Sequence, residues 1–115
     1  MNKVNYTIEN KSIIMNGKKV DLPYEIVDVV NYQSLIIVRI EPAIGNIFNK
    51  NIYAFAENGD VKWQIEESPH GTQEDKPYTS LTIDKENKII AGNWNGVDYS
   101  VSDVDGRVTP ISFNK

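Results

Sequence analysis

Two strand-forming runs joined by Asn58-Gly59 limit the possible folds of this chain more than any other feature. Asn and Gly both tolerate the positive φ that the two central residues of a tight hairpin turn require, so residues 51–65 read as a β-hairpin. A two-residue turn would pair Ala54 with Trp63 and place one apolar set on a single face of the strands. We expect this set to lie in the core: Ile52, Ala54, Ala56, Val61, Trp63 and Ile65.

Strand patterns continue on both sides of this hairpin. Residues 1–22 contain a short strand and a second hairpin, which we expect to cover an edge of the main sheets, and residues 24–65 and 79–113 each read as a meander. No segment of ten or more residues shows a helical period with caps, so little or no helix is expected. We therefore predict one all-β domain over residues 1–115. It is an antiparallel meander of about 10–11 short strands that form two blade-like sheets, packed as a sandwich or bent barrel.

Two further patterns predict how the strands are buried. The segment 35–40 is apolar on both faces, which indicates a central strand that is covered on both sides. A two-residue turn at Asn95-Gly96 would give the last meander one apolar face. That face would carry Ile90, Gly92, Trp94, Val97, Tyr99 and Val101.

Residues 51–65 also resemble the blade repeat of quinoprotein-type β-propellers. In that repeat, a strand ending in Tyr-Ala-hydrophobic-Asp leads through Gly into a strand that carries Trp, as Tyr53-Ala-Phe-Ala-Glu leads through Gly59 to Trp63 here. A weaker copy lies at 97–111, where Pro110 replaces Trp. A closed propeller needs at least four blades of about 40 residues each, more than this chain contains. The resemblance therefore implies blade-like meanders and carries over no quinone or metal site.

Composition restricts the classes of function. The chain has no cysteine, which excludes disulfides and thiolate metal sites. Its net charge is −4 and it has only two arginines, Arg39 and Arg107, so the basic surface that nucleic-acid binding needs is missing. No apolar run reaches the length of a signal peptide core or a membrane span. We expect a bacterial-type cytoplasmic protein with no nucleic-acid or membrane partner.

The long connections are the best place for a binding site. If strand direction alternates, the connections 21–24, 41–50, 66–78 and 93–96 fall at one end of the sheets, and long loops on a rigid β scaffold commonly bind partners. We take this loop-rich end as the candidate binding surface. It carries Tyr24, Arg39, Glu41, Phe48, Glu66, His70, Asp75, Tyr78 and Trp94.

No motif predicts catalysis, a cofactor or a metal. His70 is the only histidine, and although it could form a loose metal site with Glu66, Glu67 and Asp75, an ordinary loop histidine is the preferred interpretation. Residues 103–106 read Asp-Val-Asp-Gly but lack the later ligands of a calcium loop, so a turn is preferred there too.

These observations favour a small, acidic, non-catalytic binding module that acts through protein–protein contacts. Its bulk properties resemble those of antitoxin and immunity proteins, and its acidic, aromatic-bearing face would suit a basic partner protein. Two alternatives stay open. One is a small-ligand binder or enzyme that uses Arg39, Glu41, Glu66 and His70 at the loop-rich end. The other is a structural module that forms homo-oligomers through its sheet edges.

Overall fold

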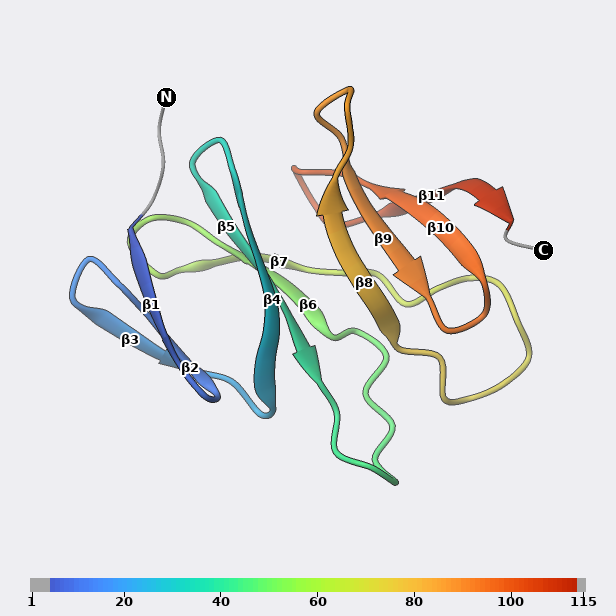
Figure 1. The fold of residues 1–115 in the computed structure, drawn as a ribbon, viewed down its shortest axis with the longest axis horizontal. Coiled ribbons are helices and arrows are strands. Elements are labelled where there is room, and N and C mark those ends of the chain that lie inside the picture. Colours follow the sequence, from blue (N-terminus) through green and yellow to red (C-terminus); the bar gives the residue numbers. More distant parts are fainter. Residues whose placement is uncertain (1–4, 114–115) are drawn as a thin grey trace.

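The computed structural model describes residues 5–113 and, over that range, contains eleven strands and no helix (Figure 1). Every strand pair is antiparallel. The all-β prediction is confirmed. The strands are β1 (Tyr6–Glu9), β2 (Ser12–Met15), β3 (Lys18–Asp21), β4 (Glu25–Tyr32), β5 (Leu35–Glu41), β6 (Ile52–Phe55), β7 (Val61–Gln64), β8 (Tyr78–Ile83), β9 (Ile89–Asn93), β10 (Val97–Val101) and β11 (Val108–Phe113).

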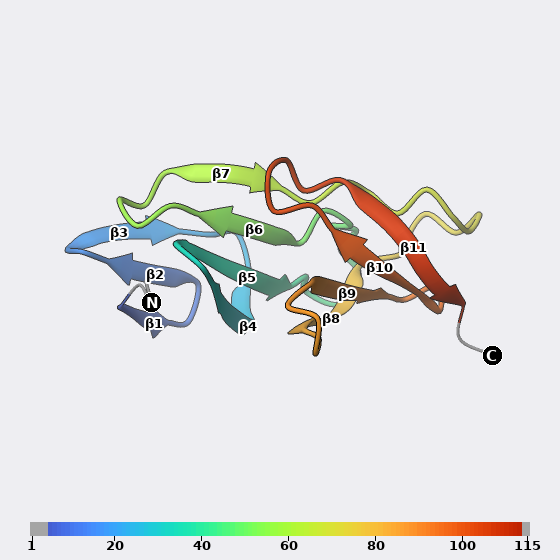
Figure 2. The same ribbon diagram turned by 90° about the horizontal axis from the view of Figure 1, so that it is seen from above.

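These strands form three sheets that follow one another along the chain. The N-terminal sheet has the order β1-β2-β3, the middle sheet β4-β5-β6-β7 and the C-terminal sheet β11-β10-β9-β8. The two predicted meanders are the middle and C-terminal sheets, and none of the three closes into a barrel. Figures 1 and 2 show them side by side, with the middle sheet between the other two.

The middle sheet is covered on both faces, as the pattern of residues 35–40 predicts. Ile36, Val38 and Ile40 of β5 pack in one buried cluster with Ile13 and Met15 of the N-terminal sheet. Ile37 faces the other way, into a cluster with the C-terminal sheet. Fully burying one such side chain contributes about 1.5–3 kcal/mol, so the alternation of β5 stabilises both interfaces at once.

The N-terminal hairpin covers a face of the middle sheet, so the prediction that it covers an edge is wrong. Ile13 and Met15 are fully buried, and Ile8 and Val20 pack beside them. An edge offers mainly unpaired backbone groups, whereas four apolar side chains on one face of a sheet need an apolar surface to cover them. The second face of β5 supplies that surface.

The turn at Asn58-Gly59 is longer than the predicted two residues. Ala54 pairs with Trp63 as predicted, but Phe55 then pairs with Val61 after a shift of register. Positive φ occurs at Gly59 and not at Asn58, and the Gly59 N–H donates to the Ala56 carbonyl at 2.9 Å. The extra residue leaves Val61 55% exposed, so Val61 and the half-buried Ala56 are not core as predicted. Ile52, Ala54, Trp63 and Ile65 are core.

The same difference occurs at Asn95-Gly96. The Gly96 N–H donates to the Asn93 carbonyl at 2.9 Å, and Tyr99 pairs with Ala91, whereas a two-residue turn would set it opposite Gly92. Because a shift of one residue turns side chains to the opposite face, the prediction that Ile90, Gly92 and Trp94 share a face with Tyr99 is wrong. Val97, Tyr99 and Val101 are core, with Ile89 and Ala91 beside them.

The two blade-like segments occupy equivalent places in their sheets. Phe55 of β6 packs toward the N-terminal sheet, and Tyr99 of β10 packs toward the middle sheet, so each faces the sheet that precedes it in the chain. The turn glycines behave alike. Gly59 lies against Lys18 and Gly106 against Trp63, each at positive φ and each touching the preceding sheet.

Candidate functional site: a cleft at the loop-rich end

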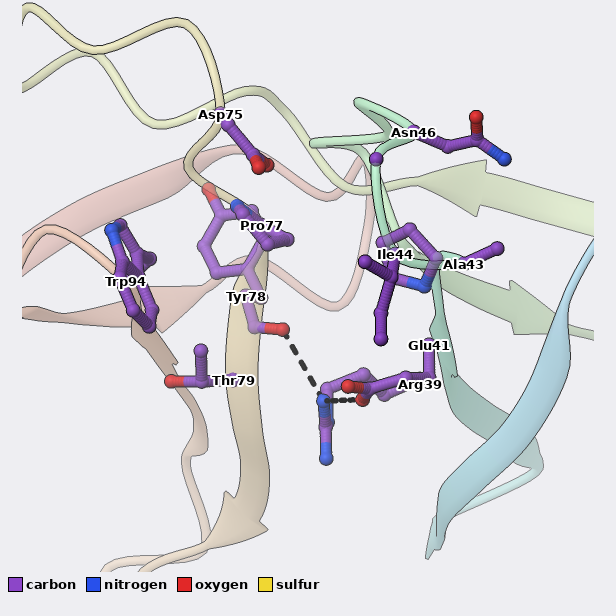
Figure 3. A pocket seen from close by; sticks show the side chains of 12 residues that line it. Arg39, Glu41, Ala43, Ile44, Asn46, Asp75, Pro77, Tyr78, Thr79 and Trp94 are labelled. Atoms are coloured by element: carbon purple, nitrogen blue, oxygen red, sulfur yellow. Dashed lines mark hydrogen bonds and ion pairs between the residues drawn. The ribbon is translucent and has the colours of Figure 1, made fainter.

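The long connections gather at one end of the sheets, at the lower side of Figure 1. Between the 42–51 loop, the 65–77 loop and the turn at 94–96 lies a cleft of about 460 Å³. Figure 3 shows its walls, with Trp94 and Thr79 on one side and the 42–46 segment on the other. Its lining residues are Arg39, Glu41, Pro42, Ala43, Ile44, Gly45, Asn46, Asp75, Pro77, Tyr78, Thr79 and Trp94.

Arg39 lies at the base of the cleft, where β5 ends. Its side chain is only 12% exposed, and its Nε donates to Asp28 Oδ2 at 2.6 Å. Its Nη1 lies 3.3 Å from both Glu41 Oε1 and the Tyr78 carbonyl oxygen. A largely buried guanidinium needs such partners. Arg39 therefore links the middle sheet to the C-terminal sheet below the cleft.

Trp94 forms one wall and remains 66% exposed. Its backbone N–H donates to the Pro77 carbonyl at 3.0 Å, and the neighbouring Asn93 Nδ2 donates to the Lys76 carbonyl at 2.9 Å. These two bonds hold the indole beside residues 75–77. A large aromatic ring that is anchored through its backbone but left in solvent is a typical binding hot spot.

The opposite wall carries exposed apolar side chains. Ile44 is fully exposed and lines the cleft, and Ile47 lies further along the same loop. The loop is closed by a turn in which the Asn46 N–H donates to the Ala43 carbonyl at 2.9 Å. Apolar side chains that face each other across a polar-rimmed cleft indicate a contact surface for another molecule.

Buried asparagines brace the loops that make the cleft. The fully buried Asn51 donates from Nδ2 to the Ile40 carbonyl at 3.0 Å and to the Tyr78 carbonyl at 2.9 Å, and its Oδ1 accepts from the Tyr78 N–H at 2.9 Å. Asn49 Oδ1 accepts from the Lys76 N–H at 2.9 Å. Nothing in the sequence separates these two residues from ordinary turn asparagines, and sequence reasoning missed them.

The long 65–77 loop is fixed to the C-terminal sheet by a second polar network. The buried Tyr99 hydroxyl lies 2.5 Å from Ser68 Oγ and 2.8 Å from His70 Nδ1. Asn95 Nδ2 donates to Ser68 Oγ at 2.8 Å. Ser68 is itself buried, so its hydroxyl is not an accessible nucleophile. His70 therefore helps to hold the 65–77 loop against the C-terminal sheet.

Tyr78 is the buried link between core and cleft. Its hydroxyl donates to the Glu66 carbonyl at 2.7 Å, and its ring lies in the core. Burial raises the pKa of Tyr78 far above its ordinary value, and electrostatic repulsion between its ionised form and the nearby Tyr99, Glu66 and Glu67 adds to the rise. The phenol therefore stays protonated at neutral pH, and the Tyr78 carbonyl is already bonded to Arg39 and Asn51.

The structure brings five of the nine predicted surface residues to the cleft: Arg39, Glu41, Asp75, Tyr78 and Trp94. Tyr24 and Phe48 instead pack edge to face at 5.5 Å over the core between the N-terminal and middle sheets. Glu66 accepts from the Val108 N–H at 2.9 Å and, like His70, lies outside the cleft. The enzyme alternative needs Arg39, Glu41, Glu66 and His70 to converge. Of these four, only Arg39 and Glu41 line the cleft and contact each other.

Within residues 5–113, no group of three or more His, Cys, Asp or Glu side chains is placed to hold a metal ion. No helix in that range is long and apolar enough to cross a membrane.

Comparison with known proteins places the chain in a family. A family model described as "Domain of unknown function (DUF7957)" matches residues 1–113, so the chain belongs to that family. Neither the curated proteins nor the solved structures gave a match.

Proposed function

We propose that this DUF7957 chain is a small non-catalytic binding module that holds another protein at its loop-rich end. The observation that carries the proposal is the exposed apolar pair Trp94 and Ile44 on opposite walls of one cleft. Aromatic anchors beside a concave surface contribute a large share of binding energy in protein complexes.

The frame around the cleft supports this use. Asn51 and Asn49 fix the loops through buried hydrogen bonds, and the backbone of Trp94 is bonded to Pro77. Binding to a surface that is already ordered costs less conformational entropy than binding to a mobile loop. Trp94 and Ile44 are thus already in position before a partner binds.

Catalysis has less support from the same geometry. Arg39 is already bonded to Asp28, the Tyr78 phenol is held in its neutral form, and His70 is bonded to Tyr99 away from the cleft. A general acid or base must reach the reacting group at hydrogen-bond distance. The cleft lining offers Glu41 and Asp75 for that role. The Thr79 hydroxyl also lines the cleft, and it donates to the Gly92 carbonyl at 3.5 Å rather than to either carboxylate.

Charge suggests the nature of the partner. The loop-rich end carries the exposed carboxylates of Glu41, Glu67, Glu74 and Asp75, while the chain as a whole has a net charge of −4. Such a surface accelerates association with a basic protein. We assign the module to the bacterial cytoplasm, with a role like that of an immunity protein or antitoxin.

A small-ligand binder is the second candidate, and the cleft itself favours it. Its volume of about 460 Å³ lies within the range of about 300–1,000 Å³ that small-molecule sites occupy. The exposed side chains of Ile44 and Trp94 on its walls favour the larger partner.

Affinity capture with matched variants tests the proposal. The immobilised chain, Trp94→Ala, Ile44→Ser and the control Val104→Ser are each exposed to a lysate of the source cell. Val104 is 77% exposed in the turn at the opposite end of β10, so its substitution removes similar apolar surface elsewhere. One protein should be retained by the wild type and the control and lost from both cleft variants. Equal retention by all four, or retention by none, would show that the cleft holds no partner.

A further inference from the structure

The chemistry of the cleft identifies the group that it is built to hold. Glu41 and Asp75 line it together with the exposed indole of Trp94. Figure 3 shows Asp75 above the cleft, Glu41 beside Arg39 at its base and Trp94 along one wall. An aromatic face and carboxylates around one cavity favour a cation, because both attract positive charge.

The positive charges near the cleft are already engaged. Arg39 is the single cation that lines it, and its closest partner is Asp28 at 2.6 Å, with Glu41 at 3.3 Å. Lys76 follows Asp75 in the sequence, but its Nζ turns away to the His70 carbonyl at 3.1 Å and the residue is buried. Within residues 5–113, Asp75 forms no ion pair. The cleft therefore keeps an excess of negative charge.

The walls suit the stem of a long cationic side chain. Ile44, Pro77 and Trp94 provide apolar surface along the cleft. Lysine and arginine bury their methylene chains against such surface while the charged end reaches polar groups. A free inorganic cation would make no use of these walls.

We propose that the cleft receives a lysine or arginine side chain of the partner protein, with Trp94 against its stem, Asp75 at its charged end and Glu41 adding negative charge at the base of the cleft. This inference rests on the proposed function, because it assigns chemistry to the same surface. It makes Asp75 a determinant of which partners bind, while Trp94 and Ile44 provide contact area.

Capped tripeptides with a central lysine, arginine or norleucine test the inference. They are titrated into the ¹⁵N-labelled chain while the indole Nε1–H resonance of Trp94 is followed by NMR. The Trp63 indole donates to the Asp103 carbonyl at 2.9 Å and serves as an internal reference. Saturable shifts of Trp94 are expected with lysine or arginine. Equal shifts with norleucine, or no saturable shift with any peptide, would overturn the inference.

Charge-neutral variants separate local recognition from general attraction. Asp75→Asn should weaken binding of the cationic tripeptides by about fivefold to tenfold, in line with the loss of one charge-assisted hydrogen bond. Glu41→Gln should weaken it in the same direction. Glu86→Gln removes the same charge at an exposed turn on the opposite end of the sheets. It should leave binding unchanged. An equal loss in Glu86→Gln would mean that net charge, not the cleft, attracts the peptides.

The two proposals can fail separately. If the captured protein is lost from Trp94→Ala but retained fully by Asp75→Asn, the binding module stands and the cation inference is wrong. If the tripeptides bind at Trp94 but no protein is lost from the cleft variants, the cation site stands and the protein-binding function is wrong.

Discussion

Asn51 bonds to three backbone groups with a single side chain. It bonds to the Ile40 carbonyl and to both the N–H and the carbonyl of Tyr78, and it is fully buried. The amide supplies both a donor and an acceptor, so no shorter or purely acidic side chain satisfies all three groups.

Asn51→Ala should therefore lower the free energy of unfolding by about 2–4 kcal/mol, because three buried backbone groups lose their partner. Urea unfolding followed by circular dichroism measures the change. Asn46→Ala, at an exposed position of the same loop, is the control and should cost less than about 0.5 kcal/mol. Similar losses in the two variants would contradict a bracing role for Asn51.

The raised pKa of Tyr78 predicts how stability depends on pH. An unfolded tyrosine titrates near its ordinary pKa of 10.0, whereas burial keeps the folded phenol protonated to higher pH. The folded state thus holds its proton more tightly, and its stabilising effect is complete below pH 10 and is lost as the pH rises through the folded pKa.

Tyr78→Phe should remove part of that dependence. At pH 7 it should cost about 1 kcal/mol, because the Glu66 carbonyl loses its donor. Above pH 10 its stability should fall less steeply than that of the wild type. Urea unfolding at pH 7, 10 and 11 measures the free energy of unfolding of both proteins. If it changes with pH in the same way in the two, the raised pKa of Tyr78 is not the cause of the dependence. Tyr53 also has a pKa raised by burial, so some dependence remains in the variant.

At the scale of the elements, the turn glycines decide where each meander meets its neighbour. A Cβ at Gly106 would lie 2.7 Å from Trp63 Cε3 and 3.0 Å from the Gln64 carbonyl oxygen, at a φ of +78°. A Cβ at Gly59 would lie 2.8 Å from Lys18 Cδ, at a φ of +91°. Both positions strain an L-residue, but only Gly59 faces a flexible side chain.

Gly106→Ala is expected to cost about 2–4 kcal/mol, because neither the packed indole nor the backbone oxygen can move away. Gly59→Ala should cost only about 1 kcal/mol, mainly from the positive φ, since Lys18 can turn into solvent. Thermal and urea unfolding of both variants provide the comparison. A larger loss in Gly59→Ala would show that the backbone, and not the contact, controls the cost.

Much of the element structure could be predicted from the sequence, because it depends on local patterns. The apolar residues on both faces of segment 35–40 predicted a covered central strand, and Ala54 does pair with Trp63. The length of the turns at the Asn-Gly pairs was harder to predict, because the same dipeptide can form a two-residue turn or end a longer one. The choice sets the exposure of Val61 and Trp94.

The site could be predicted in part. Alternating strand direction was enough to place the long loops together, and with them Arg39, Glu41 and Asp75. The path of the 65–77 loop depends on the contacts of His70 with Tyr99 and of Asn49 with Lys76. These contacts join residues more than twenty positions apart, and no local pattern encodes them.

For the whole molecule, the outer faces of the N-terminal and C-terminal sheets limit how many sheets can pack together. In the N-terminal sheet Thr7 and Lys19 flank Ile14, and in the C-terminal sheet Thr82 and Ser100 flank Ile90. Both isoleucines are only partly exposed. Polar outer faces are how stacked repeats end, because a further layer would need an apolar surface.

The chain should therefore be a monomer in solution. Light scattering at micromolar concentration should give a mass near 13.0 kDa. A dimer or larger assembly would instead support the alternative in which sheet edges join several chains.

The order of the three sheets also matters while the protein is being synthesised. Once the hairpin ending at Ile65 has left the ribosome, the N-terminal and middle sheets have all their strands, and each has the other to cover it. The opposite face of the middle sheet, with Ile37, Ala54 and Trp63, then stays bare until the last four strands emerge. Transiently exposed apolar surface of this kind promotes aggregation. Translation speed after residue 65 thus sets how long this apolar face stays uncovered.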